Sequence, residues 1–340
     1  MSNVFVYCEI TEENLVADVS LELLSKGKKL ANELGLKLEA LVIGNEVKNL
    51  ESTLYPYGVD VIHFAQDKRL FPFTTLPHTS IIVNLFKELK PEIMLFGASS
   101  VGRDLAPRVA SALKCGLTAD CTSLEIGDHT ETKSAKTYKN LLYQIRPAFG
   151  GNIIATIVNP ETRPQMATVR EGVMKKEIFQ ADYKGILNKL EVAKYTLPSD
   201  FVCEIIERHI EAQKVNIKGS QIIVAGGYGV GSKENFKLLY ELAGVLGAEV
   251  GATRAAVDGG FIDHERQIGQ TGVTVRPKLY IACGISGAVQ HRAGMDQSSK
   301  IISINTDPNA PINKISDYVI TGSVQEVLPK MIKYYKAHSK

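Results

Sequence analysis

The stretch Leu279-Tyr-Ile-Ala-Cys-Gly-Ile-Ser-Gly-Ala-Val-Gln-His-Arg-Ala-Gly-Met295 determines how the second half of this chain is interpreted. Its first residues form a short apolar run, which predicts a buried strand. Small residues then follow at Gly284, Ser286, Gly287 and Ala288. They let the backbone come close to a ligand and leave N–H groups free to meet a phosphate. Gln290 and His291 add two polar side chains. This pattern indicates a cofactor pocket at the carboxyl end of a strand.

Strands and helices are predicted to alternate on both sides of this stretch. Strand, glycine turn, helix and further strands are typical of a Rossmann-like, doubly wound parallel sheet. The strands expected after residue 220 are Gln221–Ala225, Leu279–Ala282, Ile301–Asn305 and Val319–Ile320, and the helices are Glu234–Leu246 and Val324–His338.

A glycine-rich turn, Ala225-Gly-Gly-Tyr-Gly-Val-Gly-Ser232, follows the first of these strands. By itself it is a loose match to the dinucleotide-binding pattern G-x-G-x-x-G and carries little weight. We expect Ser232 and Asn235 to cap the next helix, whose N-terminus would face a pyrophosphate.

The first half of the chain also alternates, and a βαβ rhythm predicts a second parallel sheet with helices on both faces. Strand-like runs separated by polar turns between Ser123 and about Val173 predict an antiparallel extension of it. We place a domain boundary near residues 205–218, at Gln213–Gly219, which divides the chain into domains 1–210 and 211–340. The expected strands are Val4–Cys8, Leu38–Ile43, Val59–Phe64, Ile93–Phe96, Ser123–Ile126, Leu141–Ile145 and Ile153–Val158, and the helices are Leu15–Leu34, Thr79–Leu89 and Leu105–Leu113.

Composition excludes several classes of function. A net charge of +2, with lysine and arginine spread along the 340 residues, gives no reason to expect nucleic acid or an anionic membrane surface. No apolar run approaches the length of a membrane span, and the N-terminus carries no secretory signal, so we expect a cytoplasmic protein. Five cysteines without CxxC spacing predict reduced, mostly buried thiols and no metal site.

Three blocks of the second half together resemble the large, or alpha, subunit of electron transfer flavoproteins. They are Gly251-Ala-Thr-Arg-Ala-Ala-Val-Asp-Gly-Gly260, Gln267-Ile-Gly-Gln-Thr-Gly272 and the opening stretch, and they occur in the family's order and spacing. The resemblance extends through Gly102–Arg108, Arg146–Asn152 and Arg163–Arg170, and it covers nearly the whole chain. It implies a nucleotide-hydrolase-like N-terminal domain and a C-terminal domain that binds FAD.

The resemblance also implies roles for individual residues. Arg254 would lie against the flavin ring, where a guanidinium that keeps its proton stabilises the reduced, anionic flavin. Thr271 stands where the family hydrogen-bonds the flavin N5. His291 stands where it approaches the O2/N1 edge, and a donor or positive charge there favours the reduced anion. The family's Gly-Gly-Arg-Gly turn carries an arginine that reaches the cofactor. Tyr228 replaces it here, so we expect no such contact.

A wider set of residues is expected to touch FAD on the same grounds, with residues 286–290 at the pyrophosphate and ribityl chain and Asn305, Asp307 and Ser323 toward the ribose and adenine. The full set is Thr253, Arg254, Gln267, Ile268, Gly269, Gln270, Thr271, Gly284, Ser286, Gly287, Ala288, Val289, Gln290, His291, Asn305, Asp307 and Ser323.

The function implied by the resemblance is electron transfer in a heterodimer with a smaller beta subunit. Its partner would be a flavin dehydrogenase such as an acyl-CoA dehydrogenase, and the chain alone would not be an enzyme. The sequence of Thr274–Cys283 resembles the electron-bifurcating group, which also uses NADH and ferredoxin, while a simple carrier stays open.

Three alternatives to this function are a nicotinamide-dependent dehydrogenase, a non-catalytic scaffold subunit and an enzyme with a Cys283–His291 nucleophile. The residues weigh against the first and last: no convincing acidic fingerprint ends the second strand, and Cys283 lacks an activating neighbour.

Overall fold

The computed structural model describes residues 3–132, 135–148, 153–208 and 217–338. They form two compact units, one within residues 3–208 and the other made mainly of residues 217–338. Our division at residues 210 and 211 lies outside the described residues. Within the described ranges, no helix is both long and apolar enough to span a membrane.

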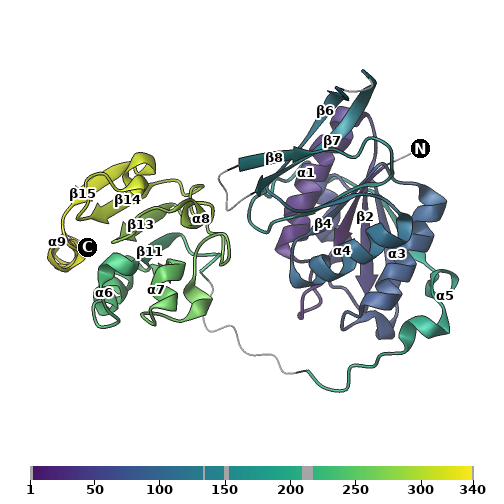
Figure 1. Cartoon of the computed structure of the whole chain (residues 1–340). Helices are drawn as coiled ribbons and strands as arrows, with labels where there is room; N and C mark the ends of the chain where they lie inside the picture. Colours follow the sequence, from purple (N-terminus) through teal and green to yellow (C-terminus); the bar gives the residue numbers. More distant parts are fainter. Residues whose placement is uncertain (1–2, 133–134, 149–152, 209–216, 339–340) are drawn as a thin grey trace. The chain divides into compact units, whose positions relative to one another are not determined.

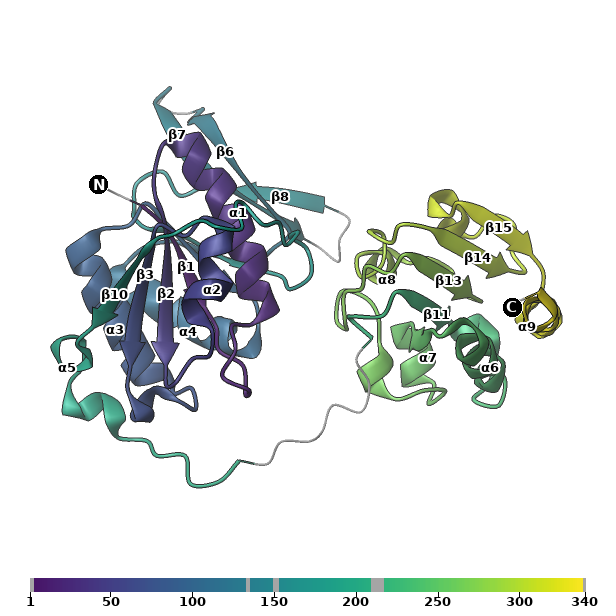
Figure 2. The same cartoon turned by 180° about the vertical axis from the view of Figure 1, so that it is seen from behind.

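The first unit is built on a seven-stranded parallel sheet with the order β10-β3-β2-β1-β4-β9-β5. Helix α1 covers one face, and α3 and α4 cover the opposite face (Figures 1 and 2). The two apolar layers follow from the alternation of side chains along each strand: Val6 packs with α1, and Phe5 packs with α3. The strands are β1 (Val4–Cys8), β2 (Leu38–Gly44), β3 (Val61–Gln66), β4 (Ile93–Gly97), β5 (Leu117–Cys121), β9 (Gln165–Val169) and β10 (Ile186–Leu190), and the helices are α1 (Asp18–Leu34), α2 (Leu50–Leu54), α3 (Thr75–Leu89), α4 (Ser100–Leu113) and α5 (Val192–Tyr195).

Several predicted starts in this unit were wrong. Helix α1 begins at Asp18 and not at Leu15, because Ala17 is the extended residue at its N-cap. Helix α4 begins five residues before the predicted Leu105, because the Ser99 hydroxyl accepts a hydrogen bond from the Gly102 amide and caps the helix there. Helix α3 begins before Thr79, at Thr75. Helix beginnings depend on the local backbone conformation and on capping, which apolar spacing does not report.

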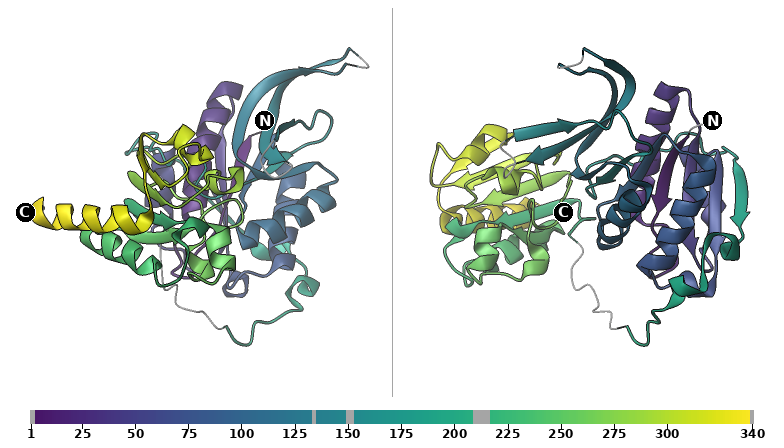
Figure 3. Two further views of the ribbon diagram at one scale, coloured as in Figure 1. Left: turned by 60° about the vertical axis from the view of Figure 1, so that its left-hand side comes forward. Right: turned by 45° about the vertical axis from the view of Figure 1, so that its right-hand side comes forward.

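The antiparallel extension is a separate three-stranded sheet, β6-β7-β8, formed by Ser123–Thr130, Thr137–Ala148 and Ile153–Ile157. Strands β6 and β7 pair antiparallel, as predicted, and form the long curved ribbon in Figure 3. The prediction was wrong in extending this region to Val173, because β9 at Gln165–Val169 returns to the large sheet and pairs parallel with both β4 and β5. A strand whose five residues are all buried belongs in a central position of the sheet.

The second unit contains a five-stranded parallel sheet with the order β12-β11-β13-β14-β15, which confirms the Rossmann-like prediction. Helices α6 and α9 pack on one face, while the other face is covered largely by the connecting segments. The order in which strands are added reverses at β11: β12 lies on one side of it, and β13, β14 and β15 follow on the other. A crevice is therefore expected at the carboxyl ends of β11 and β13. The elements are β11 (Ile222–Gly226), α6 (Phe236–Leu246), β12 (Glu249–Ala252), α7 (Arg254–Asp258), β13 (Leu279–Cys283), α8 (Val289–Arg292), β14 (Ile301–Asn305), β15 (Tyr318–Thr321) and α9 (Val324–His338).

Candidate functional site

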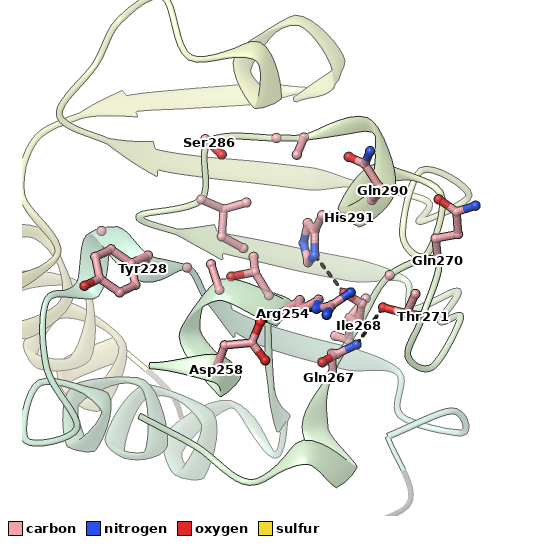
Figure 4. Close-up of a pocket in the computed structure, with 18 of the residues that line it drawn as sticks. Tyr228, Arg254, Asp258, Gln267, Ile268, Gln270, Thr271, Ser286, Gln290 and His291 are labelled. Atoms are coloured by element: carbon pink, nitrogen blue, oxygen red, sulfur yellow. Dashed lines mark hydrogen bonds and ion pairs between the residues drawn. The ribbon is translucent and has the colours of Figure 1, made fainter. Parts of the chain in front are cut away.

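A pocket of about 530 Å³ lies at the carboxyl ends of β11, β12 and β13, within the second unit (Figure 4). Its size is in the range that holds a cofactor or a drug-sized ligand. It is lined by Gly227, Tyr228 and Gly229 after β11, by Thr253, Arg254, Ala255 and Asp258 at α7, by Gln267–Thr271, and by Gly284–Ala288, Gln290 and His291 after β13.

Backbone hydrogen bonds bring the three sequence blocks together around this pocket. The Ile268 amide donates to the Ala252 carbonyl over 2.8 Å, which attaches the loop 267–272 to β12. The Gln270 amide donates to the Gln290 carbonyl over 2.7 Å and joins the same loop to α8. These bonds join the three blocks into one pocket wall.

Glycines allow the loops after β11 and β13 to pass each other at backbone contact. A Cβ atom on Gly227 would lie 2.2 Å from the Gly284 carbonyl oxygen. Gly284 itself has a φ of +60°, which favours glycine. Glycine at positions 227 and 284 is therefore required by the close approach of these two loops.

Three consecutive amides lack a backbone partner within the described part of the chain, at the point where it leaves β13. Among the described residues, no backbone carbonyl accepts a hydrogen bond from the amides of Ser286, Gly287 or Ala288. All three residues line the pocket. Unpaired donors next to each other are suited to an anionic group, as expected for a phosphate.

Arg254 and Asp258 are the charged side chains among those that line the pocket. Arg254 Nε donates to Asp258 Oδ2 over 3.3 Å, within the single short helix α7. In Figure 4 the guanidinium lies between Asp258 and Thr271. Thr253, which precedes the arginine, caps α7, because its hydroxyl oxygen accepts from the Ala256 amide. The turn therefore fixes the point from which Arg254 extends.

The Thr271 hydroxyl is oriented by its neighbour Gln267. The buried Gln267 side chain donates from Nε2 to Thr271 Oγ1 over 3.0 Å. Because that bond occupies a lone pair of the hydroxyl oxygen, the Thr271 proton stays free to be donated elsewhere. Both side chains line the pocket, so a ligand can receive that proton.

His291 makes two hydrogen bonds inside the protein. Its Nδ1 lies 2.9 Å from the Ile268 carbonyl oxygen, and its Nε2 lies 2.9 Å from the Tyr280 hydroxyl. A carbonyl can only accept, so Nδ1 carries the proton and Nε2 accepts from Tyr280. Burial lowers the pKa of the imidazole to about 4, and the ring is neutral at pH 7. This differs from the donor or positive charge expected at His291, because both ring nitrogens are already engaged.

Burial of neutral His291 predicts a loss of stability in acid. The unfolded imidazole takes up a proton near pH 6.5, whereas the folded one has a pKa of about 4. Its contribution is therefore complete above about pH 6.5 and is lost as the pH falls toward 4, by about 2 kcal/mol at pH 5. Urea unfolding at pH 7 and pH 5 should show this loss.

The matched variant for that measurement is His291→Gln, because a glutamine does not titrate. The comparison is needed since buried His78, in the first unit, also has a pKa lowered to about 4. The variant should lose only the part of the pH dependence that His291 causes. An identical pH dependence in both proteins would contradict the prediction.

Most of the predicted site residues lie in the pocket wall. The thirteen that line it are Thr253, Arg254, Gln267, Ile268, Gly269, Gln270, Thr271, Gly284, Ser286, Gly287, Ala288, Gln290 and His291.

The four other predicted residues are not among those lining the pocket: Val289, Asn305, Asp307 and Ser323. The Asn305 side chain donates to the Ile285 carbonyl, Asp307 accepts from the Asn309 amide, and Ser323 accepts from the Glu326 amide at the start of α9. Their contact with the adenine end of a cofactor stays a prediction.

The pocket also includes residues that the sequence reasoning did not select: Gly227, Tyr228, Gly229, Ala255, Asp258 and Ile285. The loose glycine pattern could have identified Gly227 and Gly229. Asp258 could have been found from its position four residues after Arg254, which places both on one side of a helix.

Tyr228 and the start of helix α6 follow β11. Tyr228 is exposed and stacks on Phe261, with ring centroids 5.4 Å apart. Asn235 occupies the N-cap position of α6, but its side chain donates to the Val230 carbonyl and does not cap the helix. No residue of α6 lines the pocket, and the placement of its N-terminus at a pyrophosphate stays a prediction.

Cys283 is unsuited to act as a nucleophile. It lies in the buried strand β13, and burial raises the pKa of its thiol to about 12, which disfavours the reactive thiolate. Of the five cysteines, all are free thiols, and Cys203 is the exposed one. In the part of the chain that the structure describes, no group of three His, Cys, Asp or Glu side chains could hold a metal ion.

Comparison with known proteins adds independent findings. Residues 4–195 match the electron transfer flavoprotein domain, and residues 216–296 match the electron transfer flavoprotein FAD-binding domain. The chain is 45% identical to the electron transfer flavoprotein subunit alpha of Thermoanaerobacterium thermosaccharolyticum, covering 98% of each chain. It is 48% identical to protein FixB of Clostridium saccharobutylicum, covering 98% of this chain and 96% of that one. A third relative is the acryloyl-CoA reductase electron transfer subunit beta of Anaerotignum propionicum, 39% identical over 98% of this chain and 95% of that one.

Proposed function

The chain belongs to the electron transfer flavoproteins as an FAD-binding alpha subunit, and on this premise we propose how its residues hold the cofactor and which partners it serves. The family implies a heterodimer with a beta subunit. The flavin accepts and releases electrons when it is bound. The work of this chain is then to bind that flavin and to set its reduction potential.

The proposal depends above all on the convergence of the three family blocks on one pocket. The flavin ring is placed beside Arg254 and Thr271, since these supply a fixed positive charge and a free hydroxyl proton to it. The pyrophosphate is placed at the amides of residues 286–288, since these have no backbone acceptor among the described residues. The glycines keep the two loops of the pocket wall together, because a Cβ on Gly227 would lie 2.2 Å from the Gly284 carbonyl oxygen.

His291 has a structural part in this proposal. Its neutral ring links the Ile268 carbonyl to Tyr280 of β13 and so fixes the loop that carries Thr271. The ring contributes no charge to the flavin at pH 7, because its pKa is lowered to about 4. Arg254 is then the source of positive charge among the side chains that line the pocket.

We further propose that the unit within residues 3–208 packs against the beta subunit and that the partner is a dehydrogenase acting on acyl-CoA compounds. The relative from Anaerotignum propionicum supports the proposed dehydrogenase partner, because its name joins an electron transfer subunit to an acryloyl-CoA reductase. A second candidate is an electron-bifurcating complex that also uses NADH and ferredoxin. The sequence of Thr274–Cys283, which resembles that group, favours this second candidate.

The flavin content of the heterodimer tests these proposals. The chain is co-purified with its beta subunit, saturated with FAD, and desalted, and flavin is then measured by absorbance against protein. One FAD per heterodimer would indicate a simple carrier, and two would support bifurcation, which NADH and ferredoxin assays would then examine. A heterodimer without any flavin would overturn the assignment of the pocket.

A further inference from the structure

The carboxylate of Asp258 is placed where a cofactor site of this kind does not need one. FAD carries a doubly negative pyrophosphate, yet Asp258 lines the same pocket as Arg254. With His291 neutral, the lining side chains sum to zero formal charge, one positive and one negative. A negative charge in this position opposes both the pyrophosphate and a reduced, anionic flavin.

Helix stability does not explain the pair. Helix α7 has five residues, with Arg254 first and Asp258 last. The helix dipole favours acidic residues at the N-terminus and basic residues at the C-terminus, so both charges occupy the unfavourable end. The order of the pair, basic before acidic at i and i+4, is also the weaker of the two orders. Both side chains are largely exposed in this chain, 68% and 62% respectively, where ion pairs stabilise little.

We infer that Asp258 is a potential-setting residue: by pairing with Arg254 in the wall of the FAD pocket, it offsets part of the guanidinium charge and keeps the flavin's reduction potential lower than Arg254 alone would set it. This inference rests on the proposed placement of the flavin ring beside Arg254. The pair gains strength when a cofactor covers it, because a charge pair removed from water is screened less.

The test is the first reduction potential of the FAD bound to the purified heterodimer, measured for wild type and for Asp258→Asn. The variant keeps the side-chain shape and removes the charge. We expect its potential to rise, with the reduced flavin held about fivefold more tightly relative to the oxidised flavin, which is about 40 mV for one electron. Asp258→Glu, which keeps the charge, should stay near wild type. The matched control is Asp263→Asn, an exposed acid of the same unit that does not line the pocket, and its potential should not move.

A double-mutant cycle with Arg254→Ala separates this inference from the function on which it rests. If Asp258 acts through Arg254, the rise caused by Asp258→Asn should shrink by more than half in the Arg254→Ala background. An equal rise in both backgrounds, or no rise in wild type, would overturn the role of Asp258 while leaving the placement of the flavin intact. Only an unchanged potential in Arg254→Ala itself would show that the flavin ring is not beside this arginine.

Discussion

Replacing Arg254 by alanine is expected to lower the first reduction potential of the bound flavin and to weaken its reduced form. The guanidinium remains charged at any working pH, and it is the positive group among the side chains that line the pocket. Removing one fixed charge beside the ring should cost the reduced flavin about 1.4 kcal/mol or more, which is about tenfold in relative binding and about 59 mV for one electron. Spectroscopic redox titration of the FAD-loaded heterodimer measures this directly.

Two further variants show whether the effect belongs to the charge at this position. Arg254→Lys keeps a positive charge but loses the planar fork, so its potential should fall between those of wild type and alanine. Lys314→Ala removes an exposed cation of the same unit that does not line the pocket, and its potential should match wild type. If Arg254→Ala and Lys314→Ala shift the potential equally, the effect comes from net charge and not from contact with the flavin.

Gly227→Ala is expected to damage both the stability of the second unit and its retention of FAD. The new Cβ would lie 2.2 Å from the Gly284 carbonyl oxygen and 2.8 Å from the Ile285 Cα. Both obstacles are backbone, so no side chain can rotate away, and the loops after β11 and β13 must separate. Overpacking of this kind costs about 1–3 kcal/mol. It also displaces part of the pocket wall, so FAD should be lost on gel filtration under conditions where wild type keeps it.

The control for this substitution is Gly244→Ala, because the same change is made where there is room. Gly244 lies on the exposed side of α6, and a Cβ there would meet nothing within 4 Å. Alanine in a helix interior is favoured over glycine by about 0.5–1 kcal/mol, so this variant should be slightly more stable and should retain FAD fully. Equal FAD retention in Gly227→Ala and Gly244→Ala would contradict the close approach of the two loops.

The sequence alone predicted the parallel sheet of the second unit and the three blocks that form its site. Buried strands such as Leu279–Cys283 are continuous apolar runs, and the glycines that follow mark backbone contact, so both are local signals. The strand Gln165–Val169 could not be placed in the same way. Its partners β4 and β5 lie far from it in sequence, and its position in the large sheet depends on long-range pairing.

Part of the chemistry of the site follows from the sequence, and part depends on the tertiary structure. Residue types determined that Arg254 brings a permanent charge and that Tyr228 cannot replace the family's arginine, because these properties belong to single side chains. Only the tertiary structure decided that His291 is neutral, since that depends on burial and on Tyr280 and Ile268, which approach it from β13 and from the loop after β12. The i+4 spacing already puts Asp258 on the same side of a helix as Arg254, and the tertiary structure adds that this side lines the pocket.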